Sequence, residues 1–156
     1  MKALRTRKQL AMSWYIFFLH LPWLPEWYLS KDGFRKLRAV SPIPVIADES
    51  CTTATDIPAL DGAVHGINIK LSKCGGLAEA RRMIAEARRR DMKVMLGCMI
   101  ESSVGITAVA HLAPLVDYAD LDGAALLSDD PYVGATIDDG MIRLPAEAGL
   151  GVRLKD

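Results

Sequence analysis

From Asp32 onward, short apolar runs alternate with helical stretches, and this alternation limits the possible folds more than any other feature of the chain. Strands are predicted at 43–47, 66–70, 93–99 and 118–121. Helices are predicted at 33–40, 55–60, 77–90 and 104–112. Strands that alternate with helices pair in parallel, because each helix carries the chain back across the sheet. The pattern therefore predicts an α/β fold made of repeated strand-helix units.

A polar or reactive residue stands at the end of each predicted strand. In chain order these residues are Asp48, Lys70, Cys98 and Asp122. Right-handed crossover connections bring such strand ends side by side on one rim of the sheet. In a (β/α)8 barrel the active site lies on this rim, at the C-terminal ends of the strands. We therefore expect the four residues to contribute to one site.

The chain is too short for a complete barrel. It has 156 residues, whereas a barrel of this type needs roughly 250. Residues 33–156 are predicted to form about the last four strand-helix units, a partial (β/α)8 barrel, with a short strand at 141–145 outside it. Residues 1–32 do not follow the strand-helix alternation. Their apolar run at 11–21 is too short to cross a bilayer as a helix. We interpret 1–32 as an irregular or disordered segment, with a shifted reading frame as the alternative.

The charge balance indicates the class of partner, and the cysteines indicate the cellular location. Lysine plus arginine number 19, as do aspartate plus glutamate, so no net field attracts nucleic acid or an anionic membrane. A small molecule is therefore the expected partner. Cys51, Cys74 and Cys98 are odd in number and form no CxxC pair, which favours a reducing, cytoplasmic location.

Four motifs carry a family resemblance that extends from about Gly33 to the C-terminus. They are Pro44–Ser50, Asn68–Lys70 followed by Gly75 and Gly76, Gly97–Glu101, and Asp120–Gly123. Together they resemble the C-terminal half of enolase-superfamily enzymes of the muconate-lactonising subgroup. The Asp-x-Asp at the last strand makes the chain most similar to the dipeptide epimerases that act on L-Ala-D/L-Glu.

The resemblance implies a Mg²⁺-dependent reaction in which a base removes the proton α to a carboxylate and leaves an enediolate. Asp48 would be a metal ligand, since Mg²⁺ prefers hard oxygen ligands. Glu49 would help to orient the metal site. Lys70 would be one of two acid/base groups, a pattern that general accounts of this superfamily describe. Taken alone, Asp48 could equally cap a helix and Lys70 could be a solvated surface charge.

The resemblance also assigns a substrate-binding part. Asp120 and Asp122 alternate with Leu121 and would receive a substrate ammonium group, whereas an N-acylated amino acid would leave both charges unpaired. An ordinary acidic turn is the alternative for this pair. Cys98 and Ile100 match positions that contact the substrate, although Cys98 could simply be a small buried residue. Lys73 recurs in the family motif but lies past the strand end, so we assign it no catalytic role.

Other features of the family have no match in this chain. They are a Lys-x-Lys motif with the second base, two further acidic metal ligands on preceding strands, and an N-terminal capping domain. A single carboxylate holds Mg²⁺ weakly, so we predict that this polypeptide alone is inactive or nearly so. Two alternatives remain open. One is another racemase or lactonising enzyme of the subgroup, and the other is a non-catalytic half-barrel subunit that pairs with itself or with a separately encoded first half.

Overall fold

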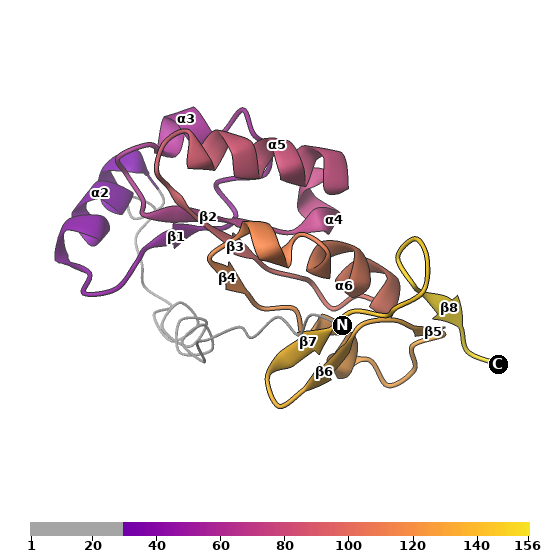
Figure 1. The fold of residues 1–156 in the computed structure, drawn as a ribbon. Coiled ribbons are helices and arrows are strands. Elements are labelled where there is room, and N and C mark those ends of the chain that lie inside the picture. The colour runs from indigo at the N-terminus through magenta and orange to yellow at the C-terminus, as the bar shows by residue number, and fades with distance from the viewer. Residues whose placement is uncertain (1–29) are drawn as a thin grey trace.

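The computed structural model describes residues 30–156 (Figure 1). The helices are α2 (Lys31–Val40), α3 (Ile57–Leu60), α4 (Leu71–Cys74), α5 (Leu77–Arg88) and α6 (Ser103–Ala110), with 3-10 turns at Ala113–Leu115 and Gly123–Leu126. The strands are β1 (Ile46–Ala47), β2 (Gly66–Ile69), β3 (Lys93–Leu96), β4 (Tyr118–Ala119), β5 (Tyr132–Val133), β6 (Thr136–Asp138), β7 (Met141–Arg143) and β8 (Arg153–Leu154). No helix among these residues is long and apolar enough to cross a membrane.

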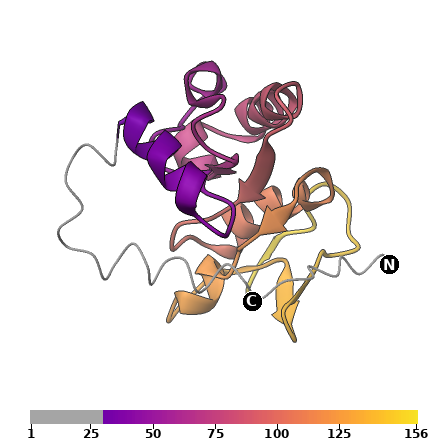
Figure 2. The ribbon, with the colours of Figure 1, turned by 90° about the vertical axis from the view of Figure 1, so that its left-hand side faces the viewer.

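Strands β1 to β4 form one parallel sheet in chain order. The predicted strand-helix alternation is therefore confirmed for residues 43–121. Helices form an arc over one face of this sheet (Figure 2). Parallel pairing without exception leaves the C-terminal ends of all four strands on the same edge, as the prediction of a partial barrel requires.

The register shows which side chains share a face of the sheet. Ala47 pairs with Ile67 and Ile67 with Val94, and all three are buried. On β2, Ile67 and Ile69 are fully buried, whereas Asn68 and Lys70 lie on the opposite face because side chains alternate along a strand. The apolar face meets the helices, and the other face carries the polar residues toward the rim.

The first strand is shorter than predicted. The sequence predicts 43–47, but β1 contains only Ile46 and Ala47. Pro42 and Pro44 have no backbone N–H to offer to a sheet, so regular pairing begins after them. Val45 instead donates its N–H to Nδ1 of His65 at 2.9 Å.

The short helix α4 was not predicted. Its four residues follow Lys70 directly, and Gly75 ends the helix with φ of +87°. Only glycine adopts this left-handed conformation at little cost. The N–H of Gly75 bonds to the carbonyl of Leu71 at 3.0 Å, which closes the turn.

Two small antiparallel sheets follow the parallel sheet and lie at the end of the molecule away from α2 (Figure 1). Strands β6 and β7 form a hairpin whose turn, at Asp139 and Gly140, has positive φ at both positions. The strand predicted at 141–145 is thus confirmed as β7. The buried carboxylate of Asp130 joins this region to α6 by accepting bonds from the N–H and the hydroxyl of Ser103.

We predict that Ile67→Ala lowers the free energy of unfolding by about 2 to 5 kcal/mol, because it opens a cavity between the sheet and the helices. Ile67→Val should cost about 0.5 to 1.5 kcal/mol. Urea denaturation of the two variants measures both effects. The control is Leu154→Ala, whose side chain is 65% exposed. A larger loss in the control than in Ile67→Ala would contradict this description of the core.

Candidate active site

An ion pair joins the ends of β1 and β2 at the rim. Asp48 follows β1 and Lys70 follows β2. The Lys70 Nζ lies 2.7 Å from the Asp48 Oδ2. The Lys70 side chain is only 5% exposed, so its ammonium depends on this partner. An unpaired charge at such a position would be strongly unfavourable.

Lys73 adds a second cation to the same carboxylate. Its Nζ lies 2.8 Å from the Asp48 Oδ1 and 3.1 Å from the Glu49 Oε1. Lys73 reaches Asp48 because the single turn of α4 brings a residue three positions after Lys70 back beside it. The motif match at Lys73 could have indicated this contact, but sequence reasoning placed the residue outside the site. Glu49, predicted to support the site, contacts Lys73 among the described residues.

These contacts shift two pKa values in opposite directions. Burial acts to raise the pKa of Asp48, but hydrogen bonds and charge from Lys70 and Lys73 outweigh it, so this pKa lies below its ordinary value of 3.8. For Lys73, burial disfavours the charged ammonium and so acts to lower the pKa. Its bonds to Asp48 and Glu49 more than reverse that effect and leave the Lys73 pKa raised. Asp48 is therefore held as a carboxylate between two ammonium groups.

A second set of titratable residues lies at the ends of β3 and β4: Cys98 follows β3, and Asp120 and Asp122 follow β4. Burial raises the pKa of Asp120, the charge of Asp122 raises it further, and Lys70 acts in the opposite direction. Burial also raises the pKa of Cys98, with a smaller opposing effect from its bond to the N–H of Gly123. The raised pKa argues against a nucleophilic thiolate at Cys98. Because Lys70 and Asp122 both act on the pKa of Asp120, the fold places these three residues near one another at the rim.

Ile100, the remaining predicted substrate contact, lies in the loop after β3 and is 66% exposed. An exposed apolar side chain beside a polar rim is available for contact with a ligand.

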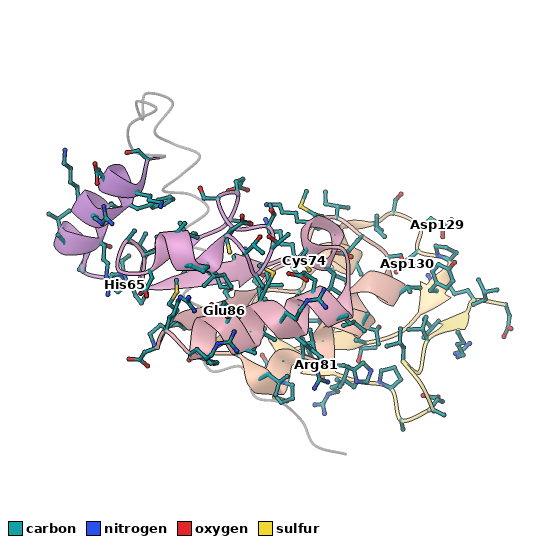
Figure 3. The ribbon with its side chains drawn as sticks, turned by 90° about the horizontal axis from the view of Figure 1, so that it is seen from above. His65, Cys74, Arg81, Glu86, Asp129 and Asp130 are labelled. Atoms are coloured by element: carbon teal, nitrogen blue, oxygen red, sulfur yellow. The ribbon has the colours of Figure 1, made fainter. Side chains whose placement is uncertain are left out.

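In Figure 3, Cys74 lies well away from His65 and toward the side of Asp130. His65 precedes β2 and Cys74 follows it. In this view Cys74 therefore marks the edge of the sheet at which the strands end, where the rim lies.

The donor set at Asp48 fits a Mg²⁺ ion only as one part of a larger site. Carboxylate oxygen suits Mg²⁺, which takes one or two carboxylates together with water and substrate oxygens. Within residues 30–156, however, no cluster of three or more His, Cys, Asp or Glu side chains could hold a metal. Both oxygens of Asp48 already contact an ammonium group. A bound Mg²⁺ would therefore have to displace a lysine from one oxygen of Asp48, and Asp48 would then be one ligand of the ion.

The chain resembles proteins of one family in sequence. The model of the "Enolase C-terminal domain-like" family matches residues 2–156. The L-Ala-D/L-amino acid epimerase of Flavobacterium johnsoniae is 47% identical over 123 residues, which are 79% of this chain and 37% of that protein. The N-acetyl-D-glutamate racemase of a Pseudoalteromonas species is 42% identical over 102 residues, or 65% of this chain and 32% of that protein. The matched part thus spans about a third of the length of either relative.

The fold has a close match among solved structures. The dipeptide epimerase from Enterococcus faecalis, solved with Mg and the dipeptide L-Leu-L-Tyr, has a TM-score of 0.72 and 35% sequence identity. The match covers 80% of this chain and 37% of that structure. Sequence and fold therefore point to the same family, and the matched part is again a minor share of the longer chain.

We predict that Asp48→Asn lowers the free energy of unfolding at pH 7 by about 3 to 5 kcal/mol, because it leaves the buried Lys70 ammonium without its counter-charge. The folded-state pKa of Asp48 is depressed, so the wild-type carboxylate contributes stability above pH 3.8 and loses it as the pH falls through the lower folded value. The gap between the two proteins should therefore narrow in acid. Urea denaturation across a pH series measures it.

The matched control for this experiment is Asp32→Asn, which breaks an exposed ion pair with Arg35. Exposed pairs contribute little, so the control should cost less than about 1 kcal/mol at pH 7. A cost for Asp48→Asn no larger than that of the control would contradict a stabilising role for the Asp48 cluster.

Proposed function

Because the chain belongs to the enolase C-terminal domain-like family, we propose that it carries the lysine-bearing half of a dipeptide epimerase that acts on dipeptides of the L-Ala-D/L-Glu type. The observation that carries this proposal is the buried Lys70 ammonium, paired with Asp48 at a strand end and electrostatically coupled to Asp120. Relatives named as epimerases of L-Ala-containing compounds support the same conclusion.

Lys70 would handle the α-proton on one face of the substrate carbon. As an ammonium group it can deliver a proton, and as a neutral amine it can remove one. Epimerisation needs a second base on the opposite face, so Lys70 provides half of the proton transfer. Burial limits the access of bulk water to Lys70 during proton transfer, and exchange of its N–H groups with solvent between turnovers would carry deuterium from D₂O to the substrate.

Asp48 would contribute one ligand to a Mg²⁺ ion, the ion found with dipeptide in the Enterococcus faecalis structure. When bound, such an ion would offset the negative charge that develops on the substrate carboxylate after α-proton removal. The part left to this chain is to keep Asp48 ionised and oriented. The two lysines that lower the pKa of Asp48 would serve that purpose.

Asp120 and Asp122 would bind the free amino terminus of the dipeptide. Burial and the neighbouring charge of Asp122 raise the pKa of Asp120, so a cation placed between the two carboxylates would relieve both effects. Ile100 would contact an apolar part of the substrate, and Cys98 would line the site without acting as a nucleophile. The substrate class follows from this acidic pair rather than from Lys70.

A second function has its own support. The Pseudoalteromonas relative is named a racemase of N-acetyl-D-glutamate, a compound without a free ammonium group. A racemase of N-acylated amino acids would use Lys70 and Asp48 in the same way. It would gain nothing from two carboxylates at the far end of the substrate. For this reason we favour the dipeptide.

We predict that, in whichever form of the protein exchanges the α-proton of the C-terminal residue of L-Ala-L-Glu in D₂O with Mg²⁺ present, Lys70→Ala abolishes the exchange. Deuterium incorporation followed by NMR measures the exchange. If the chain alone is inactive, as we expect of a single base and a single carboxylate, the same residues can be tested in a chimera. There, residues 33–156 replace the matching part of the Flavobacterium johnsoniae epimerase. An active chimera that tolerates Lys70→Ala would contradict the proposal.

We further predict that the active form prefers L-Ala-L-Glu to N-acetyl-L-glutamate, and that Asp120→Asn with Asp122→Asn reduces or reverses this preference. The physical reason is that the ammonium group loses its two counter-charges while the acetyl group loses nothing. The ratio of kcat/KM for the two substrates measures the effect. An unchanged ratio in the double variant would favour the N-acylamino acid racemase or an acidic turn with no role in binding.

A further inference from the structure

Asn68 lies beneath the rim on the same face of β2 as Lys70. Two positions separate the two residues, and side chains two apart in a strand point to the same side. Ala47 pairs with Ile67 across β1 and β2, so Asp48 and Asn68 are neighbours on adjacent strands. The Asn68 side chain is more than nine-tenths buried, with 8% exposed. It therefore occupies an interior position directly beside the ion pair.

The amide of Asn68 contacts Asp48. Its Nδ2 donates a hydrogen bond of 3.1 Å to the Asp48 Oδ2, the oxygen that also meets the Lys70 Nζ at 2.7 Å. The other oxygen, Oδ1, meets Lys73. A carboxylate only accepts hydrogen bonds, so the amide must turn its nitrogen toward Asp48. The carboxylate is thus fixed from below by a neutral donor and from two other directions by cations.

The other half of the amide has no partner among the described residues. The Asn68 Oδ1 is buried and accepts no hydrogen bond from any of residues 30–156. An unsatisfied buried acceptor destabilises the folded state, because its desolvation is not repaid by a hydrogen bond. A leucine of similar shape would avoid that cost, so stability alone does not explain an asparagine at this position.

The neighbouring strand leaves room for this amide. Gly97 follows β3, and a Cβ added there would lie 2.7 Å from both the Nδ2 and the Oδ1 of Asn68. Any larger residue would therefore displace the amide from Asp48. The absence of a side chain at Gly97 thus leaves the space in which the Asn68 amide can bond to the Asp48 carboxylate.

We propose that Asn68 is a positioning residue: its amide fixes the orientation of the Asp48 carboxylate and, through it, the position of the Lys70 ammonium. This inference deepens the proposed function and rests on it for its catalytic meaning, but the geometry can be tested without activity. Without the amide, the two lysines alone would orient Asp48, and the Lys70 ammonium would lose its single fixed position.

The test replaces the amide and follows the Lys70 ammonium directly. Asn68→Leu keeps the branched shape at a somewhat larger volume and removes both the donor and the unsatisfied acceptor. Asn68→Ala removes the amide without adding bulk next to Gly97. Met95→Leu is the control, because Met95 pairs with Asn68 on β3 and its replacement changes the same face without touching Asp48. Proton NMR of the ¹⁵N-lysine-labelled full chain reports the ammonium signals, and Lys70→Arg identifies the signal of Lys70.

We expect a slowly exchanging Lys70 ammonium signal in the wild type and in Met95→Leu, and loss of that signal in both Asn68 variants. Asn68→Leu should melt at the wild-type temperature or above it, because the buried unsatisfied oxygen is gone. A merely structural asparagine would give the reverse result, with lower melting temperatures and a retained signal. Retention of the signal in folded Asn68→Leu, its absence in the wild type, or failure of both variants to fold would each overturn the proposal.

A second readout separates this inference from the proposed function. In whichever form shows α-proton exchange, Asn68→Leu should lower kcat by about 10- to 100-fold with little change in KM, as is usual for residues that orient the groups of a metal site. If neither the chain nor the chimera exchanges the α-proton, the proposed function fails. The ammonium signals then still decide whether Asn68 positions Lys70.

Discussion

Parallel pairing requires a crossover between each strand and the next, so every strand from β1 to β4 leaves the sheet at the same edge. Residues far apart in the sequence meet there without any specific attraction between them. Asp48 and Lys70 are separated in the sequence by α3, β2 and two loops, yet their charged atoms lie 2.7 Å apart. The apolar face, with Ile67 and Leu96 fully buried, holds the sheet against the helices and allows the opposite face to carry charge.

The charged cluster is a compromise between two electrostatic costs. Burying Lys70 is unfavourable, and so is burying part of Asp48, but each largely offsets the other when they are adjacent. Lys73 is more exposed and shifts the balance toward the ionised carboxylate. Such a pair adds little stability compared with an apolar core, so its presence at a strand end is better explained by chemistry than by folding.

The family, the α/β class and the order of the four parallel strands followed from the alternation of apolar runs and from the motifs at their ends. The bounds of β1 did not, because Pro42 and Pro44 interrupt an otherwise strand-like run. Asp48 and Lys70 were found because strand ends are marked by a change from apolar to polar residues. The site roles given to these two residues and to Glu49, Cys98, Ile100, Asp120 and Asp122 remain predictions. The division at residue 32 also remains a prediction, and residues 1–29 lie outside the described part of the chain.

Two contacts of the site depend on geometry that hydrophobic periodicity does not predict. Lys73 meets Asp48 only because α4 makes a single turn before Gly75, and a turn of four residues has no periodic pattern to detect. Asn68 meets Asp48 through the register of β1 against β2, which sequence spacing alone does not fix. A useful signal for Asn68 was its place two residues before Lys70, since a polar side chain inside an apolar strand and on the face of the site needs a partner.

The acidic pair explains why charge rather than shape would decide the substrate. Asp120 is half-buried beside Asp122, and its raised pKa reflects both burial and repulsion. A bound ammonium group would reduce this repulsion, so a dipeptide would gain an interaction that an N-acylated amino acid cannot make. Lys70 also lies near enough to act on Asp120, so the two proposed parts of the site, for proton transfer and for ammonium binding, would be electrostatically linked. Removing Asp120 would therefore change the environment of Lys70 as well as the proposed ammonium site.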